Sequence, residues 1–173
     1  MNIKKRTWVM PCVVISALAM TVSLAAAQDT QPSQSSATST ASERTIQGVW
    51  RTAVTPRNCQ TGAALLTLSG LFTFNQGGTM SEYGIGPGSS PALRSPGHGV
   101  WQREHGWQDY SFAFTYYQYN ASGVFLGSVH VRARLELGVG GDEFASRSAI
   151  EILDGNGAVI GTGCATAVGT RFE

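Results

Sequence analysis

Within residues 124–137, positions 128–137 alternate strictly between polar and apolar side chains, and this pattern constrains the fold more than any other feature of the chain. The apolar positions are Val129, Val131, Ala133, Leu135 and Leu137. The residues between them are polar or charged, among them His130 and Arg132. A period of two places successive side chains on opposite faces of a β-strand. The sequence therefore predicts a long strand with one face in a core and one face in water.

The same kind of alternation, interrupted by turns rich in Gly, Asn and Asp, continues through most of the chain after residue 45. We expect strands at 46–54, 66–74, 79–83, 100–103, 110–116, 124–137, 144–153, 159–163 and 166–172. Short turns between sequential strands favour an up-and-down meander, and closing that meander removes its two exposed edges. The predicted fold is an all-β, antiparallel up-and-down barrel of eight or nine strands.

The N-terminal region has the three parts of a cleavable secretory signal. Basic residues come first, an uncharged apolar run covers 13–24, and three alanines end at Ala27. We expect a signal peptide over 1–27, a disordered leader rich in Ser, Thr and Gln over 28–45, and one barrel domain over 46–173. The apolar run is too short to serve as a permanent transmembrane helix, and we expect no stable membrane span after cleavage. The expected location is the periplasm or the extracellular medium.

Cleavage would remove both lysines of the chain and leave nine arginines against eleven acidic residues. The domain has no basic stripe of the kind that binds nucleic acid, so we expect no nucleic-acid partner. Without lysine, Schiff-base chemistry and a phosphate-loop lysine are excluded. No cofactor is expected, and no Gly-x-Ser-x-Gly nucleophile motif is present.

Two cysteines follow the predicted signal peptide, Cys59 and Cys164. In an oxidising compartment we expect a disulfide between them, with two free thiols or a metal pair as the alternatives. The spacing is consistent with antiparallel pairing of the first and last strands, because Trp50 would then lie near Arg171 when Cys59 lies near Cys164. Pro56 is expected to interrupt the first strand.

Gly48-Val49-Trp50 and Arg171 resemble the two ends of the lipocalin pattern. In that family the tryptophan closes the base of the barrel and packs against an arginine of the final strand, so the resemblance implies a guanidinium on an indole face. The Thr-Asp-Tyr turn and the helix after the barrel are missing. Avidins and the allene-oxide-cyclase type of barrel share the same loose signature, so the resemblance is to the calycin type in general.

Seven aromatic residues are expected to point into the barrel, where they would either line a cavity or fill it. They are Phe72, Phe74, Trp101, Tyr110, Phe112, Phe114 and Tyr116. The leading functional hypothesis is a binding module, not an enzyme, that holds a small, largely apolar ligand. A second is an isomerase or cyclase with Glu82, Glu104 or His98 as an acid or base at the mouth. A third is an envelope or interaction protein with a filled barrel.

Residues 97–107 contain His98, Trp101, His105 and Trp107. This stretch could form a pocket rim, a metal site completed by His130, or a hairpin whose tryptophans only pack. No spacing fixes a metal geometry, so we expect no metal. The Pro- and Gly-rich residues 84–99 are expected to form a long loop, either a lid over the barrel mouth or a disordered insertion.

Overall fold

A computed structural model describes residues 45–172, which form eight strands and one short 3-10 helix. The strands are β1 (Gly48–Arg57), β2 (Leu68–Phe74), β3 (Thr79–Ile85), β4 (Gly97–Arg103), β5 (Asp109–Tyr119), β6 (Phe125–Leu137), β7 (Glu143–Asp154) and β8 (Val159–Arg171). The 3-10 helix η2 (Pro91–Leu93) lies between β3 and β4. No helix among these residues has the length and apolarity needed to cross a membrane. The expected signal peptide and leader, apart from Thr45, lie outside the described residues.

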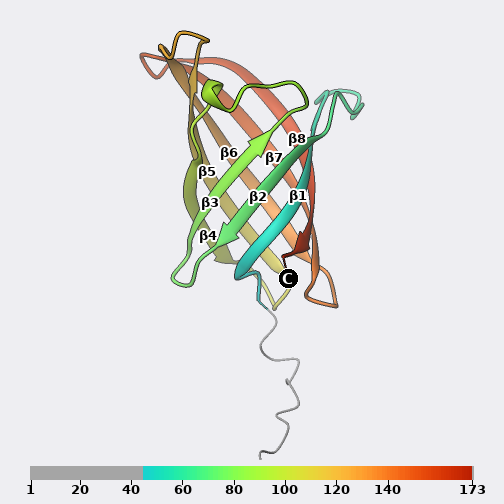
Figure 1. Ribbon diagram of the computed structural model, residues 1–173. Coiled ribbons are helices and arrows are strands. Elements are labelled where there is room, and N and C mark those ends of the chain that lie inside the picture. Colours follow the sequence, from blue (N-terminus) through green and yellow to red (C-terminus); the bar gives the residue numbers. More distant parts are fainter. Residues whose placement is uncertain (1–44, 173) are drawn as a thin grey trace, which may run out of the picture. The chain divides into compact units, whose positions relative to one another are not determined.

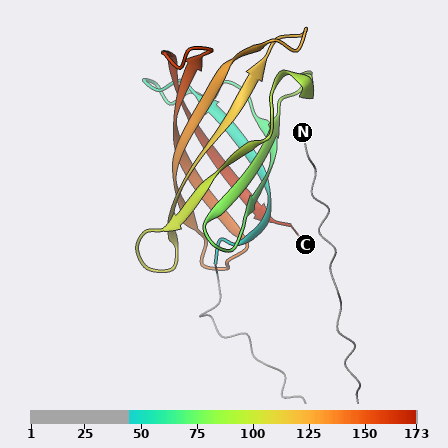
Figure 2. The ribbon, with the colours of Figure 1, turned by 90° about the vertical axis from the view of Figure 1, so that its left-hand side faces the viewer.

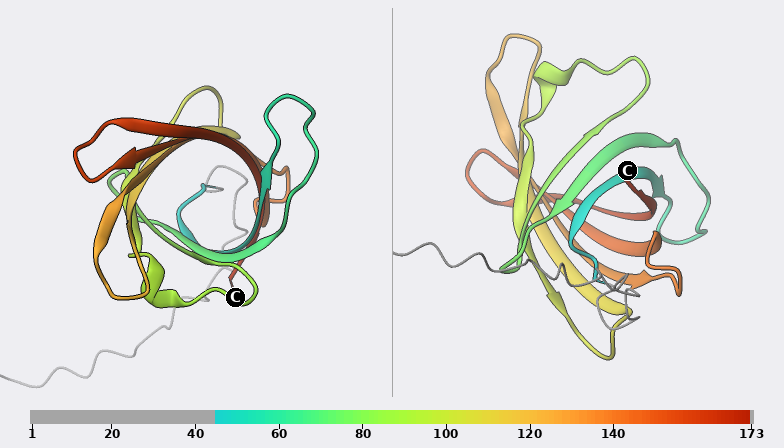
Figure 3. Two further views of the ribbon diagram at one scale, coloured as in Figure 1. Left: turned by 90° about the horizontal axis from the view of Figure 1, so that it is seen from above. Right: turned by 60° about the horizontal axis from the view of Figure 1, so that its bottom comes forward.

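The eight strands form a closed antiparallel barrel in chain order, with β1 paired to both β2 and β8 (Figures 1 and 3). The predicted all-β, up-and-down barrel is confirmed, with eight strands rather than nine. The two expected segments 159–163 and 166–172 belong to one strand, β8, which pairs continuously with β1 and β7 around Cys164. Its inward positions hold only Gly and Ala in its middle, so no apolar alternation marks the strand in the sequence.

The barrel closes in the predicted register, with Trp50 opposite Arg171. Pro56 does not interrupt β1, contrary to expectation, and lies opposite Ala165. The Pro56 carbonyl accepts a hydrogen bond from Leu65 N at 3.0 Å, so the backbone polar groups of Pro56 face away from β8. On that side β1 has already lost its partner, because pairing with β2 ends at Val54. A missing N–H therefore removes no sheet hydrogen bond there.

The two ends of the barrel, termed here the closed end and the open end, differ in their connections (Figures 1 and 2). The closed end carries the turns 75–78, 104–108 and 138–142, together with residues 45–47 and the end of β8. The open end carries the longer segments 58–67 and 86–96 and the hairpin tips 120–124 and 155–158.

The predicted loop 84–99 is shorter in the structure, because β4 begins at Gly97 instead of residue 100. A side chain at Gly97 would contact the ring of Phe114, and one at Gly99 would clash with the β5 backbone. These two glycines therefore allow β4 to lie close against β5. They were read from the sequence as loop residues, but they are strand residues.

Candidate functional site

Aromatic side chains fill the middle of the barrel. Phe72 lies with its ring centroid 5.8 Å from that of Phe112 and 6.0 Å from that of Phe114. Phe74 lies 5.8 Å from Phe112 and 6.2 Å from Trp101. All seven aromatic residues predicted for the interior lie on the inward face of their strands, but most contact one another. In an eight-stranded barrel this is enough to fill the cross-section, so these rings form a core, with Tyr116 at its margin towards the open end.

Trp50 and Arg171 close one end of this core. The guanidinium carbon of Arg171 lies 4.3 Å from the Trp50 ring centroid, and the fully buried indole donates a hydrogen bond to Ile46 O at 2.8 Å. Arg171 also donates to the carbonyls of Thr45, Gln47 and Gly141 at 2.7 to 3.1 Å. One guanidinium thus holds the segment before β1 and the turn 138–142 across the closed end.

A cavity of about 450 Å³ lies at the open end. Its wall comes from β5 to β8 and from the segment after β1, and includes Tyr116, Val129, Ile150, Ile152, Gly163 and Leu65. The side chains of Val129, Ile150 and Ile152 are apolar. Polar groups come from the Tyr116 hydroxyl and from five further residues of the wall, Arg57, Asn58, Gln60, Gln118 and Thr162. The volume lies within the range of roughly 300–1,000 Å³ that is usual for small-molecule sites.

Small residues on β8 explain why this end is hollow while the middle is full. A Cβ atom at Gly163 would lie 3.6 Å from the nearest side-chain atom of Ile150, an ordinary contact distance. A Cβ at Gly169, nearer the closed end, would overlap the ring of Phe144. The same strand therefore accommodates a phenyl ring at one level and leaves space at another.

A buried ion pair occupies the interior on the side formed by β3 and β4. Glu82 lies on the inward face of β3, and its side chain is 4% exposed. Arg94, directly after η2, contacts it with both terminal nitrogens, Nη2 to Oε2 at 2.5 Å and Nη1 to Oε1 at 3.3 Å. Nη1 also donates to Gly84 O at 3.1 Å. The guanidinium carbon lies 3.7 Å from the ring centroid of Tyr116, so the ion pair adjoins the cavity.

Burial shifts the pKa values of two side chains here, Glu82 and Tyr116. Burial raises the pKa of Glu82, and the charge and hydrogen bonds of Arg94 offset part of that rise. Burial also raises the pKa of Tyr116, again with Arg94 acting in the opposite direction. The Tyr116 hydroxyl is therefore neutral near pH 7 and can donate or accept a hydrogen bond.

The other residues proposed as acid, base or metal ligand do not meet at the mouth. We expected His98 at the mouth of the barrel, but its side chain is exposed on the outward face of β4 and does not face the interior. Glu104 lies in a closed-end turn, where hydrogen bonds from Gln102 and Ser111 lower its pKa. His130 faces outward on β6. Among residues 45–172, no group of three or more His, Cys, Asp or Glu side chains could hold a metal.

The stretch 97–107 is part of the β4–β5 hairpin. Trp101 points inward and donates from Nε1 to Asn75 O at 2.9 Å, whereas His105 and Trp107 lie exposed in the turn at the closed end. Of the three interpretations of this stretch, the hairpin is the one that the structure shows; His105 and Trp107 lie at the end of the barrel opposite the cavity and do not form its rim.

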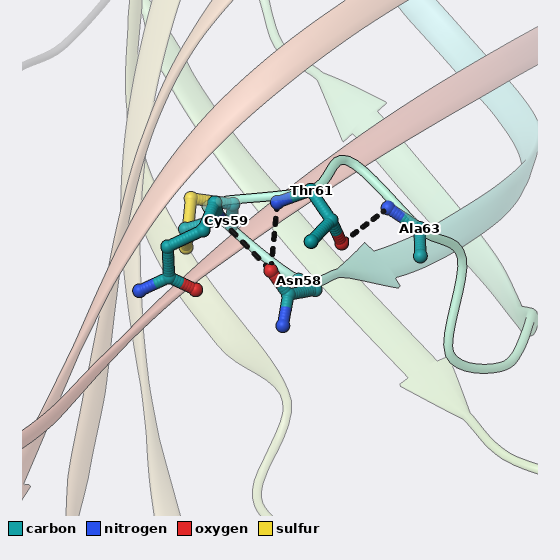
Figure 4. Close-up of a disulfide and its surroundings, with 6 residues drawn as sticks. Asn58, Cys59, Thr61 and Ala63 are labelled. Atoms are coloured by element: carbon teal, nitrogen blue, oxygen red, sulfur yellow. Dashed lines mark hydrogen bonds between the residues drawn. A yellow bond between two sulfur atoms is a disulfide. The ribbon is translucent and has the colours of Figure 1, made fainter.

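The predicted disulfide between Cys59 and Cys164 is present, with a Cα–Cα distance of 5.4 Å (Figure 4). Asn58 Oδ1 accepts hydrogen bonds from the backbone N–H groups of Gln60 and Thr61, both at 2.9 Å, which folds the chain into a tight turn at the bridge. The disulfide attaches this turn to the outward face of β8. It thereby fixes one edge of the open-end cavity.

Three polar residues of the interior were not identified from the sequence. Arg94 was not recognised, although it is the only charged residue in the segment 86–96. Thr52 and Ser146 face inward, and their buried hydroxyl groups have no hydrogen-bond partner among the described residues. Thr52 interrupts an otherwise apolar inward face of β1, which was a usable signal, whereas Ser146 is followed on the inward face of β7 by a second serine, Ser148.

Comparison with models of known protein families and with curated protein sequences finds no match. Inference about function therefore depends on the geometry of the barrel. That geometry combines a blocked end, a filled middle and a partly apolar cavity beside Tyr116 and the Glu82–Arg94 pair.

Proposed function

We propose that this protein is an exported, lipocalin-like binding protein that holds a small, largely apolar molecule in the open-end cavity. The observation that carries the proposal is a cavity of about 450 Å³ walled by Val129, Ile150 and Ile152. Apolar surface removed from water contributes about 25 cal/mol per Å², which provides the driving force for such a ligand. The Tyr116 hydroxyl would orient a single polar group of the ligand.

The closed end supports the lipocalin-like part of the proposal. Gly48 and Trp50 begin β1, Arg171 ends β8, and the guanidinium lies on the indole as the resemblance implies. The disulfide supports export, because such bonds persist mainly in oxidising compartments.

The arrangement of charges favours binding over catalysis. Glu82 is the one predicted acid–base candidate inside the barrel, and Arg94 occupies both of its carboxylate oxygens. His98 and Glu104 lie outside. An isomerase or cyclase would need a free acid or base within about 3 Å of the reacting atom. Glu82 is already paired, and His98 and Glu104 do not face the cavity, so none of the three can provide that group.

Filling the cavity tests the proposal. Gly163→Leu would place a side chain against Ile150 inside the cavity, where a Cβ atom has room. Gly140→Leu is the matched control, because it adds the same side chain to a closed-end turn where the nearest atom to a new Cβ is 3.8 Å away. The probe is N-phenyl-1-naphthylamine, a neutral dye that fluoresces in apolar surroundings.

We expect saturable fluorescence enhancement with the wild type and with Gly140→Leu, and at least tenfold weaker binding with Gly163→Leu. Equal binding by both variants would contradict the location of the site. Failure of the wild type to bind any of a set of neutral apolar probes would favour the hypothesis of an interaction protein with a filled barrel.

A further inference from the structure

Apolar side chains gather at the open end, around the cavity. At three places around this end, namely in the segment 58–67 and at the first residues of β6 and β8, two consecutive large side chains are 46% to 66% exposed. These six residues, termed here the apolar rim, are Leu65, Leu66, Phe125, Leu126, Val159 and Ile160. Elsewhere exposed apolar residues occur singly, such as Val100 and Val168 on strand surfaces and Trp107 and Val139 in closed-end turns. A concentrated apolar patch marks a surface that contacts something other than water.

The open end is also almost free of charge. The segments 58–67, 120–124 and 155–158 contain no charged residue, and 86–96 contains only Arg94, whose charge is paired inside the barrel. Asp154, at the end of β7, accepts hydrogen bonds from the backbone N–H groups of Asn156 and Ala158, so its carboxylate stabilises the turn. The rim therefore complements an uncharged, apolar partner.

From this combination we infer that the apolar rim docks onto the surface of a lipid bilayer, so that the cavity opens towards the acyl chains. Hairpin tips that carry Phe, Leu, Ile and Val without charge can insert into the boundary between headgroups and acyl chains. Arg57, at the end of β1, is a charged side chain near the mouth; it donates to Gly62 O at 3.0 Å and to Thr166 Oγ1 at 2.9 Å, and it would lie among the headgroups. The Arg132–Glu151 pair lies exposed on the strands β6 and β7, where it can remain in water.

Two other occupants fit less well. The described residues begin at Thr45, which Arg171 holds at the closed end, and β8 also ends there, so neither end of the described chain lies at the rim. A second copy would have to bury roughly 800 Å² per partner in a continuous, close-packed surface. The rim instead consists of separate projections around the mouth (Figure 3). Two such rims would meet only at their tips and leave a gap over both cavities.

Docking would define the source of the ligand, and this part of the inference rests on the proposed function. A molecule dissolved in the bilayer could pass into the cavity without crossing water. The ligand class would then be a membrane-soluble compound with one apolar chain or ring system and one polar group for Tyr116. The docking itself depends only on the rim.

The test is flotation of the exported protein, recovered after secretion from a bacterial host, with vesicles of zwitterionic phosphatidylcholine. Leu126→Asp with Ile160→Asp places two charges on the rim. Val100→Asp with Val168→Asp is the matched control, because these residues are each 59% exposed on strand surfaces away from the rim. All variants share the same N-terminus, so any difference between them arises in the barrel. Circular dichroism checks that each variant is folded.

We expect the wild type and the control to float with vesicles and the rim variant to lose at least about tenfold in partitioning, since two half-exposed side chains no longer enter the bilayer. Wild type that remains in the aqueous fraction would overturn the inference. So would a dimer in analytical ultracentrifugation that the rim substitutions dissociate, because the rim would then be a contact between copies.

The cavity and the rim can fail separately. Gly163→Leu should lose the dye but still float, whereas the rim variant should bind the dye in solution but not float. Loss of flotation by Gly163→Leu with the rim intact would overturn the inference that docking depends on the rim alone.

Discussion

The Glu82–Arg94 ion pair connects stability to the shape of the open end, and a double-mutant cycle would measure its strength. Breaking a buried ion pair from one side costs about 3–5 kcal/mol, because the remaining charge is left without compensation. Arg94→Met leaves a carboxylate whose side chain is 4% exposed, so we expect a loss near the upper part of that range at pH 7. Glu82→Met leaves a guanidinium that is 17% exposed and still contacts Tyr116, so we expect about 2–3 kcal/mol.

The double variant should lie within about 1 kcal/mol of the wild type, since two methionines of similar volume remove both charges at once. Urea unfolding followed by tryptophan fluorescence gives all four free energies of unfolding, and the coupling should be at least about 3 kcal/mol. Single variants that each cost less than about 1 kcal/mol, or a double variant equal to their sum, would refute the view that the pair is desolvated.

The same cycle has a pH dependence with a definite sign. In Arg94→Met, burial still raises the pKa of Glu82 above its ordinary value of 4.5, and the charge that lowered it is gone. The folded state then holds the proton to higher pH than the unfolded state, so stability is highest below 4.5 and falls as pH rises through the folded pKa. The deficit of Arg94→Met relative to Glu82→Met should therefore shrink between about pH 7 and pH 4. A deficit that grows on acidification would contradict this assignment.

Three further experiments test the closed end, the disulfide and the packing of β4. Arg171→Met should lower the free energy of unfolding by about 2–3 kcal/mol, since the stacking on the indole and the hydrogen bonds to three carbonyls are lost; chemical denaturation measures it. Replacing Cys59 and Cys164 by serine should cost about 2–4 kcal/mol, because the bridge closes a loop over a sequence separation of 105; unchanged thermal unfolding would contradict that. Gly99→Ala should cost about 1–3 kcal/mol, because its methyl group clashes with the β5 backbone. Gly163→Ala has room and should be neutral or slightly stabilising. Comparing the free energies of unfolding of the two variants tests whether the space beside Gly99 is filled and the space beside Gly163 is free.

The sequence was sufficient to predict the barrel because most strands have one face in the interior and one in water. β6 shows this most clearly, with five apolar residues alternating with polar ones. The register also followed, since Trp50 and Arg171 mark two ends that must meet when the barrel closes. β8 was divided in two because Ala165, Ala167 and Gly169 are buried without being recognisably hydrophobic.

The candidate site was less predictable, because each part of it depends on residues far apart in the chain. The alternation on β5 was sufficient to place its aromatic side chains in the interior. Whether they fill the barrel or line a cavity depends on the size of the side chains on the opposite strands, which the pattern of a single strand does not contain. Glu82 was identified as a candidate acid or base. Its partner Arg94 was missed because the Pro- and Gly-rich segment that carries it has no periodicity to indicate where it packs.

The division of the barrel into a filled and a hollow part follows from the sum of side-chain volumes at each level. Near the middle, Phe72 meets other rings from β5 and β7, and eight strands leave no space between them. Towards the open end, glycine at position 163 faces Ile150, and Arg94 is drawn to the other side by Glu82. The cavity therefore has room where β8 carries glycine in place of a larger side chain, and Tyr116 separates it from the buried ion pair. A function that depends on this space should be more sensitive to Gly163 than to any ring of the aromatic core, whose loss would act mainly on stability.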